Sequence, residues 1–238
     1  MPQVTDRYPA DTRIFASDVW ESMTRTNPIW PVTFWVPASI AMVAWTIYQG
    51  TSAIAAFAFF FFGLLLWTLS EYILHRFVFH YVPQNPKVRR FFFLVHQVHH
   101  DHPEYDRIVM PVPGAMILGS PILALLYFTL GGVNCWATFA GVVIGYLAYD
   151  YTHLATHFGK PKTRWMKGLR RRHQQHHHAY PDRWFGVSSS LWDYVFRTHV
   201  RRGERPTGKV YPGNLVDWNR PDFVVDGHEH GPTPEAAE

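Results

Sequence analysis

Histidine is concentrated in this chain in a pattern that suggests metal chemistry. The 238 residues include 15 histidines but only one cysteine, Cys135, so a disulfide framework and a cysteine-based zinc site are both excluded. Neutral imidazole is a good ligand for iron, zinc, copper and nickel. Ten histidines form four clusters: His75 and His80; His96, His99 and His100; His153 and His157; His173, His176 and His177. Ten imidazoles exceed the needs of one ion, so the sequence predicts a dinuclear metal site.

The spacing within the clusters indicates how the imidazoles would converge. Residues three and four apart share a face of an α-helix, so each of the two His-x-x-His-His clusters is expected to form one patch. His153 and His157 should also share a face. His75 and His80 are five residues apart, which places them on different faces of a regular α-helix. This pair is expected either at the end of a helix or on two different metals.

Other polar residues have weaker claims to the site. Five histidines lie outside the clusters, and ordinary surface or core roles are expected for them: His102, His178, His199, His228 and His230. His178 directly follows the last cluster, so it leaves the register of that cluster ambiguous. The Glu-x-x-His pattern of soluble di-iron bundles is absent. Glu71, Asp150 and Asp193 are candidate carboxylates behind the ligands, and they would accept the other N–H of a ligating imidazole. Pairing with arginine at a membrane edge is an equally good interpretation of each.

The elements that must hold these residues are indicated by four apolar runs, at 29–49, 52–70, 111–130 and 133–149, none of which contains a charged residue. A bilayer core about 30 Å thick is crossed by about 20 apolar residues in a helix. A chain this short could not cover four such helices with polar surface. The sequence therefore predicts an all-α integral membrane protein with about four transmembrane helices, arranged as two hairpins.

The connections between the runs predict the topology. Short loops near Gly50 and Gly131 place all long polar segments on one side of the membrane, and the excess of lysine and arginine there marks that side as cytoplasmic. The expected organisation is a cytoplasmic N-terminal segment at 1–28, a membrane domain with a cytoplasmic helical cap at 29–200, and a cytoplasmic tail at 201–238. The location would be the plasma membrane in a bacterium and the endoplasmic reticulum in a eukaryote. Basic and aromatic residues do not alternate in a way that would indicate nucleic-acid binding, so no nucleic-acid partner is expected.

Four stretches resemble, in order, the signature motifs of fatty acid 2-hydroxylases, which belong to the fatty acid hydroxylase and sterol desaturase superfamily. They are "WTLSEYILHRFVFH", "HQVHHDHPEYDRIVMP", "YDYTHLATHFG" and "RHQQHHHAYPDRWFGVSSSLWDYVF", and they lie within 67–198. The resemblance extends to residues that flank the histidines, which select the 2-hydroxylase branch. Two positions depart from the pattern: Gln97 replaces a frequent glycine, and Tyr180 replaces a frequent histidine.

The resemblance implies that all ten clustered histidines are metal ligands. It also implies a metal-dependent monooxygenase that uses O2 to hydroxylate a long acyl chain at the 2 position, either as a free fatty acid or within a sphingolipid. The expected cofactors are two metal ions, with iron preferred and zinc possible by ligand chemistry. Electrons would come from a separate reductase or electron-carrier protein, because no flavin or haem motif is visible. The expected partners are the acyl lipid and the bilayer.

Two alternatives remain open from the sequence. A sterol or carotenoid oxidase or desaturase of the same superfamily would keep the metal site and change the substrate. A membrane metal-binding or transport protein would place its ligands near the middle of the bilayer, along a pathway. The concentration of histidines at one end of the apolar runs argues against the transporter.

Overall fold

The computed structural model describes residues 17–207, except residues 82, 86, 87, 89–91, 93–95, 97 and 102. Within this part the chain is helical and contains no strand. The elements are α1 (Asp18–Ser22), α2 (Ile29–Tyr48), α3 (Ala53–Ile73), the π-helix η2 (Leu74–Phe79), α5 (Val98–Asp101), α6 (Tyr105–Ile108), α7 (Val112–Leu130), α8 (Asn134–Phe158), α9 (Arg164–His178) and α10 (Leu191–Val195). Residues 1–16 and 208–238, which include most of both expected terminal segments, lie outside the described residues.

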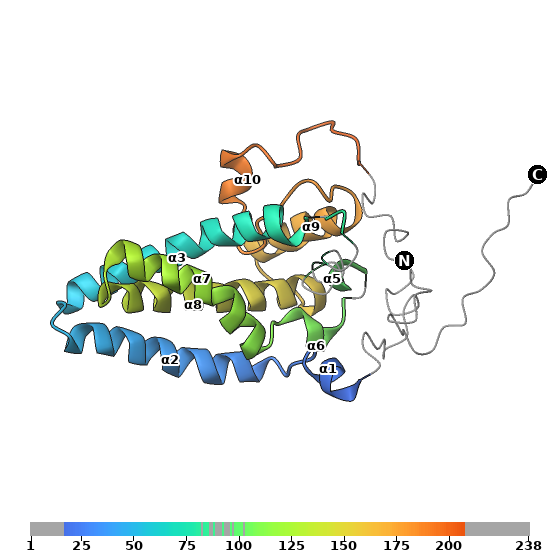
Figure 1. Cartoon of the computed structure of the whole chain (residues 1–238). Coiled ribbons are helices and arrows are strands. Elements are labelled where there is room, and N and C mark those ends of the chain that lie inside the picture. The colour runs from blue at the N-terminus through green and yellow to red at the C-terminus, as the bar shows by residue number, and fades with distance from the viewer. Residues whose placement is uncertain are drawn as a thin grey trace, which may run out of the picture.

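Four long helices form an elongated bundle, and the shorter elements gather at one end of it as a cap (Figure 1). By length and composition, three segments are able to cross a membrane: Ile29–Tyr48, Ala53–Phe79 and Tyr105–Leu130. All four of the expected apolar runs form long helices, and three of them lie in these segments. The remaining long helix, α8, occupies the centre and contacts α2, α3 and α7. Its apolar run continues without a break into Asp150, His153 and His157, which lowers its average hydropathy.

Glycine allows α3 and α8 to approach closely. A Cβ atom built on Gly63 would lie 1.9 Å from the carbonyl oxygen of Thr138, and one built on Gly141 would lie 1.9 Å from the carbonyl oxygen of Phe60. Neither position leaves room for a side chain, so the two backbones pack directly against each other. Small residues at such crossings are the usual means of close helix packing in membranes. This contact fixes α8, which carries two of the clustered histidines, against α3.

The turns and the cap complete the frame. Gly50 and Gly131 adopt φ values of 98° and 76°, which a residue with a Cβ rarely adopts, at the two short hairpins expected from the sequence. At the other end, Arg25 pairs with Glu21, Glu104 and Asp106 at distances between 2.9 and 3.1 Å. Arg107 pairs with Glu21 and, at 2.9 Å, with Glu104. This network joins the segment around α1 to α6, and so fixes the cap to the start of α7.

Candidate metal centre

The structure gathers the ten clustered histidines into two groups of five. The first group contains His75, His80, His96, His100 and His176, and the second contains His99, His153, His157, His173 and His177. Within each group, one nitrogen of every ring lies within 4.8 Å of the others. The groups are in contact, because the rings of His100 and His177 stack with their centroids 4.0 Å apart. These are the same ten residues that the spacing selected.

A π-helix brings His75 and His80 into the same group. The helix that starts at Ala53 continues from Leu74 to Phe79 in π geometry, and the amide of His80 donates to the carbonyl of His75 over 3.2 Å. Hydrogen bonds in a π-helix join residues five apart, so they stack the two residues that an α-helix would separate. His80 also lies at the end of this helix, which is one of the two arrangements expected from the sequence. The other alternative, with these residues in different groups, does not occur.

The two His-x-x-His-His clusters do not form one patch each, which corrects the expectation from their spacing. His96 and His100 enter the first group and His99 the second; His176 enters the first group, while His173 and His177 enter the second. Residues four apart differ by about 40° around a helix, whereas adjacent residues differ by about 100°. The pairs four apart therefore stay together, and the histidine beside each pair turns toward the other group. This arrangement interlocks the two groups.

The chemistry of the groups fits metal binding. Pairs of Nε2 atoms face each other at 2.7 Å between His157 and His173, and at 2.8 Å between His153 and His99. In the first group, the Nε2 atoms of His176 and His80 are 3.0 Å apart, as are those of His100 and His96. Ring nitrogens that converge on common points are what shared ions require.

The electrostatic environment favours neutral imidazoles. Burial, followed by repulsion among the neighbouring rings, holds the pKa values of His96, His99 and His100 well below the ordinary value. Burial likewise lowers the pKa values of His173 and His177. A neutral imidazole keeps the lone pair that binds a metal, so these groups need no proton loss before binding near neutral pH.

The loop between α9 and α10 orients two rings of the first group through its backbone. The Nδ1 atom of His75 lies 2.5 Å from the carbonyl oxygen of Phe185, and the Nδ1 atom of His176 lies 2.6 Å from that of Arg183. With Nδ1–H donated to these carbonyls, Nε2 is the nitrogen left to face the group centre. For His75 this atom is buried and has no hydrogen-bond partner among the described residues. Such outer contacts fix the tautomer and orientation of a ligand.

Two of the candidate carboxylates hold this loop, and their hydrogen bonds among the described residues go to the loop and to Thr198. Asp193 accepts hydrogen bonds from the amides of Phe185 and Gly186, both at 2.9 Å. Glu71 accepts from the amides of Val187 at 2.6 Å and Ser188 at 2.8 Å, and from the Ser188 hydroxyl. In place of the expected direct bond to an imidazole, Asp193 bonds to the peptide that carries the Phe185 carbonyl, and Glu71 bonds to the next two peptides of the loop. Their effect on His75 therefore passes through the loop.

The third carboxylate, Asp150, bonds to the segment that precedes α7. Its Oδ2 accepts from the amide of Met110 at 3.2 Å, and the hydroxyl of Tyr146 donates to the carbonyl of Met110 at 3.2 Å. Asp150 is fully buried, three residues before His153. The Asp150 carboxylate is thus bonded to the Met110 amide and to the Tyr146 hydroxyl, and its role is to fix the start of α7 against α8.

The histidines outside the repeated form behave as expected where they are described. His178 is exposed, next to the buried His177, which settles the register of the last cluster. The Nδ1 atom of His199 lies 3.4 Å from the carbonyl oxygen of Asp193, and His199 belongs to neither group. His102, His228 and His230 lie outside the described residues.

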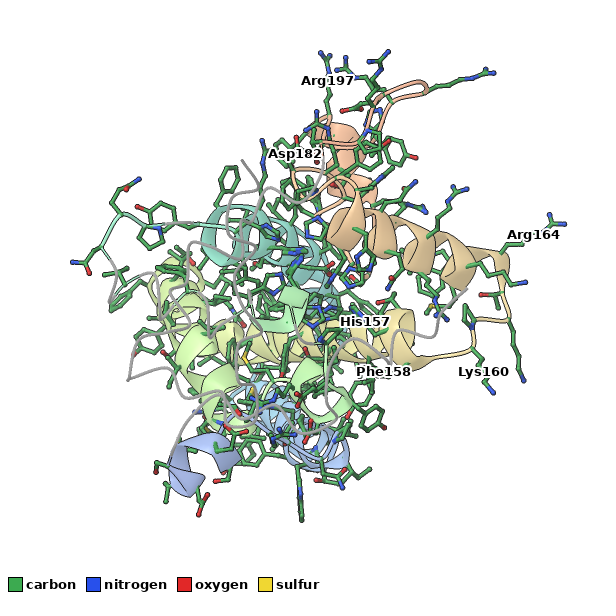
Figure 2. All side chains as sticks on the ribbon, turned by 90° about the vertical axis from the view of Figure 1, so that its right-hand side faces the viewer. His157, Phe158, Lys160, Arg164, Asp182 and Arg197 are labelled. Carbon is green, nitrogen blue, oxygen red and sulfur yellow. The ribbon has the colours of Figure 1, made fainter. Side chains whose placement is uncertain are left out.

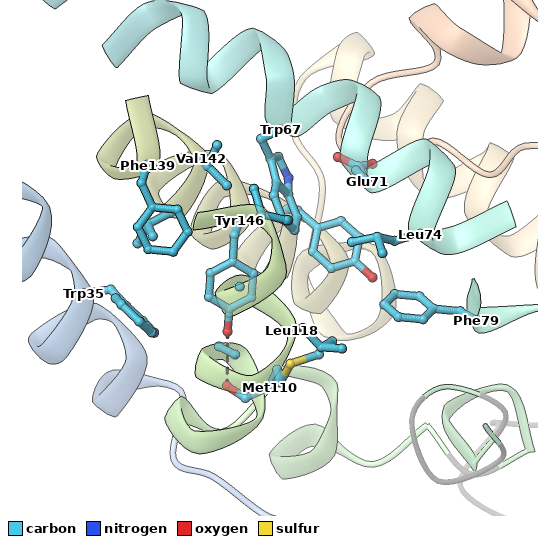
Figure 3. Close-up of a pocket in the computed structure, with 15 residues that line it drawn as sticks. Trp35, Trp67, Glu71, Leu74, Phe79, Met110, Leu118, Phe139, Val142 and Tyr146 are labelled. Carbon is cyan, nitrogen blue, oxygen red and sulfur yellow. Dashed lines mark hydrogen bonds between the residues drawn. The ribbon is translucent and has the colours of Figure 1, made fainter. Parts of the chain in front are cut away.

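An apolar cavity lies inside the bundle, next to the histidine groups. Phe79 and Tyr149 line one end of it, and their rings contact histidines of the first and second groups, at centroid distances of 5.1 Å to His96 and 5.5 Å to His153. Trp35 and Phe139 line the part deeper in the bundle, as Figure 3 shows. The cavity could not be recognised from the sequence, because its lining comes from α2, α3, η2, α7 and α8.

Comparison with known proteins agrees with this geometry. Residues 60–198 match the fatty acid hydroxylase family. The chain is 37% identical over 188 residues to dihydroceramide fatty acyl 2-hydroxylase FAH2 of Arabidopsis thaliana, covering 78% of this chain and 79% of that protein. It is 34% identical to human fatty acid 2-hydroxylase, covering 78% of this chain and 56% of that one. A structure of Scs7p, in which only the hydroxylase domain is visible, superposes with a TM-score of 0.73 at 31% identity, over 79% of this chain and 72% of that one.

Proposed function

Because the chain belongs to the fatty acid hydroxylase family, we propose that it hydroxylates long-chain acyl groups at the carbon next to the carbonyl. Relatives named for this reaction act on fatty acids and on the acyl chain of dihydroceramide, so both a free fatty acid and a sphingolipid are candidate substrates. One observation carries the proposal. The apolar cavity is lined in part by Phe79 and Tyr149, whose rings contact the two histidine groups, so an acyl chain in the cavity would have its end at the metal centre.

The ten histidines are the proposed ligands of two metal ions, five for each. Iron is the preferred ion, because an imidazole-rich site suits iron and the reaction requires a redox-active metal. When bound, the two ions would supply the activation of O2 and the oxidising power for an unactivated C–H bond, which side chains lack. The loop carbonyls of Arg183 and Phe185 hold the ring orientations that this binding requires.

The residues of the chain determine where on the substrate the reaction occurs. Trp35, Trp67 and Phe139 offer an apolar surface to the acyl tail inside the bundle. The polar head of the substrate cannot follow the tail, because an unpaired polar group in an apolar environment costs several kcal/mol, about 2–7. The head therefore stays at the cap, at the depth of the histidines. The carbon next to the carbonyl is then the first methylene to reach them.

Lipid analysis tests the activity. Expression of the protein in a host that supplies long-chain acyl lipids should give 2-hydroxylated acyl species, and the variant His99→Ala should give none. Purified protein should contain two metal ions per chain. Oxidised sterols or carotenoids, or a new double bond with no hydroxyl, would assign the chain to another branch. Metal flux across vesicles without lipid oxidation would contradict an enzymatic role.

The membrane orientation is also a proposal. We infer that the cap, the metal centre and both termini face the cytoplasm, because the cap carries the exposed basic residues of the described chain, among them Lys160, Arg164 and Lys167 (Figure 2). In a background that lacks Cys135, cysteines introduced as Thr51→Cys and Thr207→Cys should react with an impermeant reagent from opposite sides. Reaction of both from one side would contradict this orientation.

The electron donor is proposed to be a separate acidic protein. Exposed basic residues on and before α9 form a surface that an acidic carrier would recognise, as seen around Lys160 and Arg164 in Figure 2. Charge pairing of this kind raises association rates and weakens with added salt. Substituting Arg164→Glu together with Lys167→Glu should slow reduction by a carrier while leaving turnover with a small chemical reductant unchanged. Equal rates with the carrier would exclude this surface.

A further inference from the structure

The short helix α10 presents an apolar surface that no described part of the chain covers. Four of its side chains, counting the residue that ends it, are about half exposed: Leu191 at 49%, Tyr194 at 56%, Val195 at 56% and Phe196 at 47%. The opposite side of α10 carries Asp193, which is fully buried and bonded to the loop that supports His75. The helix is therefore held firmly, and its exposed apolar side faces outward.

The position of α10 indicates what its apolar side meets. The indole N–H of Trp192 donates to the hydroxyl of Thr68 on α3 at 3.0 Å, and the ring of Phe196 stacks on that of Tyr72 at 5.1 Å. α10 thus lies along α3 over one turn, in agreement with Figure 1. The outward surface of α3 around this turn is apolar and exposed at Leu65 and Ile73. The apolar side of α10 continues the surface with which α3 faces lipid.

The depth of this turn in the bilayer follows from the length of the membrane segment. Ala53–Phe79 has 27 residues, which span about 40 Å, whereas the hydrocarbon layer is about 30 Å thick and takes about 20 residues. Counted from Ala53 at the far side, the layer ends near Tyr72. Thr68 then lies four residues, or about 6 Å, inside the hydrocarbon boundary. Interfacial helices bury their apolar faces by about 5–10 Å, which matches this depth.

We propose that α10 is inserted in the cytoplasmic leaflet of the bilayer, with Leu191 and Val195 in contact with acyl chains. The chain that follows supports this assignment. Arg197 adopts a φ of 59°, and the amide of Thr198 donates to the carbonyl of Asp193 at 2.8 Å, so the chain reverses direction directly after α10. Arg197, Arg201 and Arg202 are exposed on the returning segment. Guanidinium groups there reach the lipid phosphates.

The insertion has a consequence for the site, because Asp193 and the lipid-facing residues belong to one short helix. A bilayer that holds α10 also holds the carboxylate that fixes Phe185 and Gly186. The proposal concerns the lipid contact of α10 and uses the membrane-spanning nature of α3. It does not depend on the hydroxylation of acyl chains, so an inactive preparation with bound metal still tests it.

Fluorescence quenching in lipid nanodiscs tests the insertion. In a background with Cys135→Ala, a small thiol-reactive fluorophore is attached to Val195→Cys. Leu65→Cys on α3 is the lipid-exposed control, and Arg202→Cys is the aqueous control. A lipid with a nitroxide near the top of its acyl chain should quench the label at position 195 as strongly as at position 65. Quenching by iodide at position 195 should be about fivefold or more weaker than at position 202, because anions are excluded from hydrocarbon.

Two results would overturn the proposal. Iodide quenching at position 195 equal to that at position 202 would place α10 in water. Weak quenching by both agents would show that protein covers α10, either a second copy or the chain beyond residue 207; dilution into empty nanodiscs would separate these two. Weak lipid quenching at position 65 would instead contradict the membrane assignment of α3. Metal content equal to that of the parent protein confirms that each labelled variant is folded.

Discussion

Replacing Asp193 by asparagine tests whether the loop between α9 and α10 supports the metal centre. The Asp193 carboxylate accepts three hydrogen bonds, from the amides of Phe185 and Gly186 at 2.9 Å each and from the hydroxyl of Thr198 at 2.8 Å. Asparagine keeps one acceptor oxygen and replaces the other by an NH2 group. If the oxygen keeps Phe185 and Thr198, the NH2 group faces the Gly186 amide, and two donors then oppose each other in a buried site.

The magnitude follows from this count. An unsatisfied buried donor costs about 1–3 kcal/mol. Because the loop must be in place for the Phe185 carbonyl to orient His75, that cost reduces metal affinity. At about 1.4 kcal/mol for each factor of ten, we expect weakening between about fivefold and 140-fold, which includes the range of about 10- to 100-fold known for partners that orient a metal ligand.

The assay is competition with a chelator, followed by elemental analysis. Asp193→Asn should lose metal to a lower chelator concentration than the parent protein does. Asp182→Asn is the matched control, because this carboxylate pairs with Arg183 at the surface and its side chain is 44% exposed. The control should retain metal like the parent protein. Equal retention by both variants, with unchanged thermal stability, would refute the role of the loop.

Two further predictions concern the ligands and the frame. His177→Ala should release one of the two metal ions, because His177 is buried in the second group. His178→Ala, at the exposed neighbouring position, should keep both ions, and elemental analysis distinguishes the two variants. Gly63→Ala should destabilise the bundle by about 1–3 kcal/mol or more, since its Cβ would meet backbone atoms of α8, and thermal unfolding in detergent measures this. Gly114→Ala, which meets only the flexible side chain of Met110 at 3.2 Å, should unfold like the parent protein.

Part of this architecture could be predicted from the sequence. The uncharged runs locate the long helices, because hydrocarbon selects against charge over any segment that it surrounds. The resemblance to the hydroxylase family is confirmed by the comparisons. The ten clustered histidines are those that the structure gathers, since helical spacing places imidazoles near one another before any tertiary contact is known. Their binding of two ions stays a prediction.

Other features depend on contacts that spacing does not encode. The π geometry at Leu74–Phe79 joins His75 to His80, and no pattern in that segment distinguishes it from an α-helix. The carboxylates are expected from the sequence to bond to imidazoles, but Glu71 bonds to a loop amide 116 residues away, and Asp193 bonds to one eight residues away. The apolar run at 133–149 predicts a helix, but its central place among α2, α3 and α7 follows only from the contacts of the folded chain. Each difference arises from tertiary packing.

The position of the hydroxyl across a series of acyl lengths tests the central claim most directly. If the head stays at the cap and the tail fills the cavity lined by Trp35 and Phe139, the oxidised carbon lies at a fixed distance from the carbonyl. Fragmentation mass spectrometry of lipids from cells expressing the protein should then show the hydroxyl on the carbon next to the carbonyl at every length, with only the yield changing. A hydroxyl whose distance from the carbonyl grows with chain length would show that the tail end sets the register, and would contradict the account.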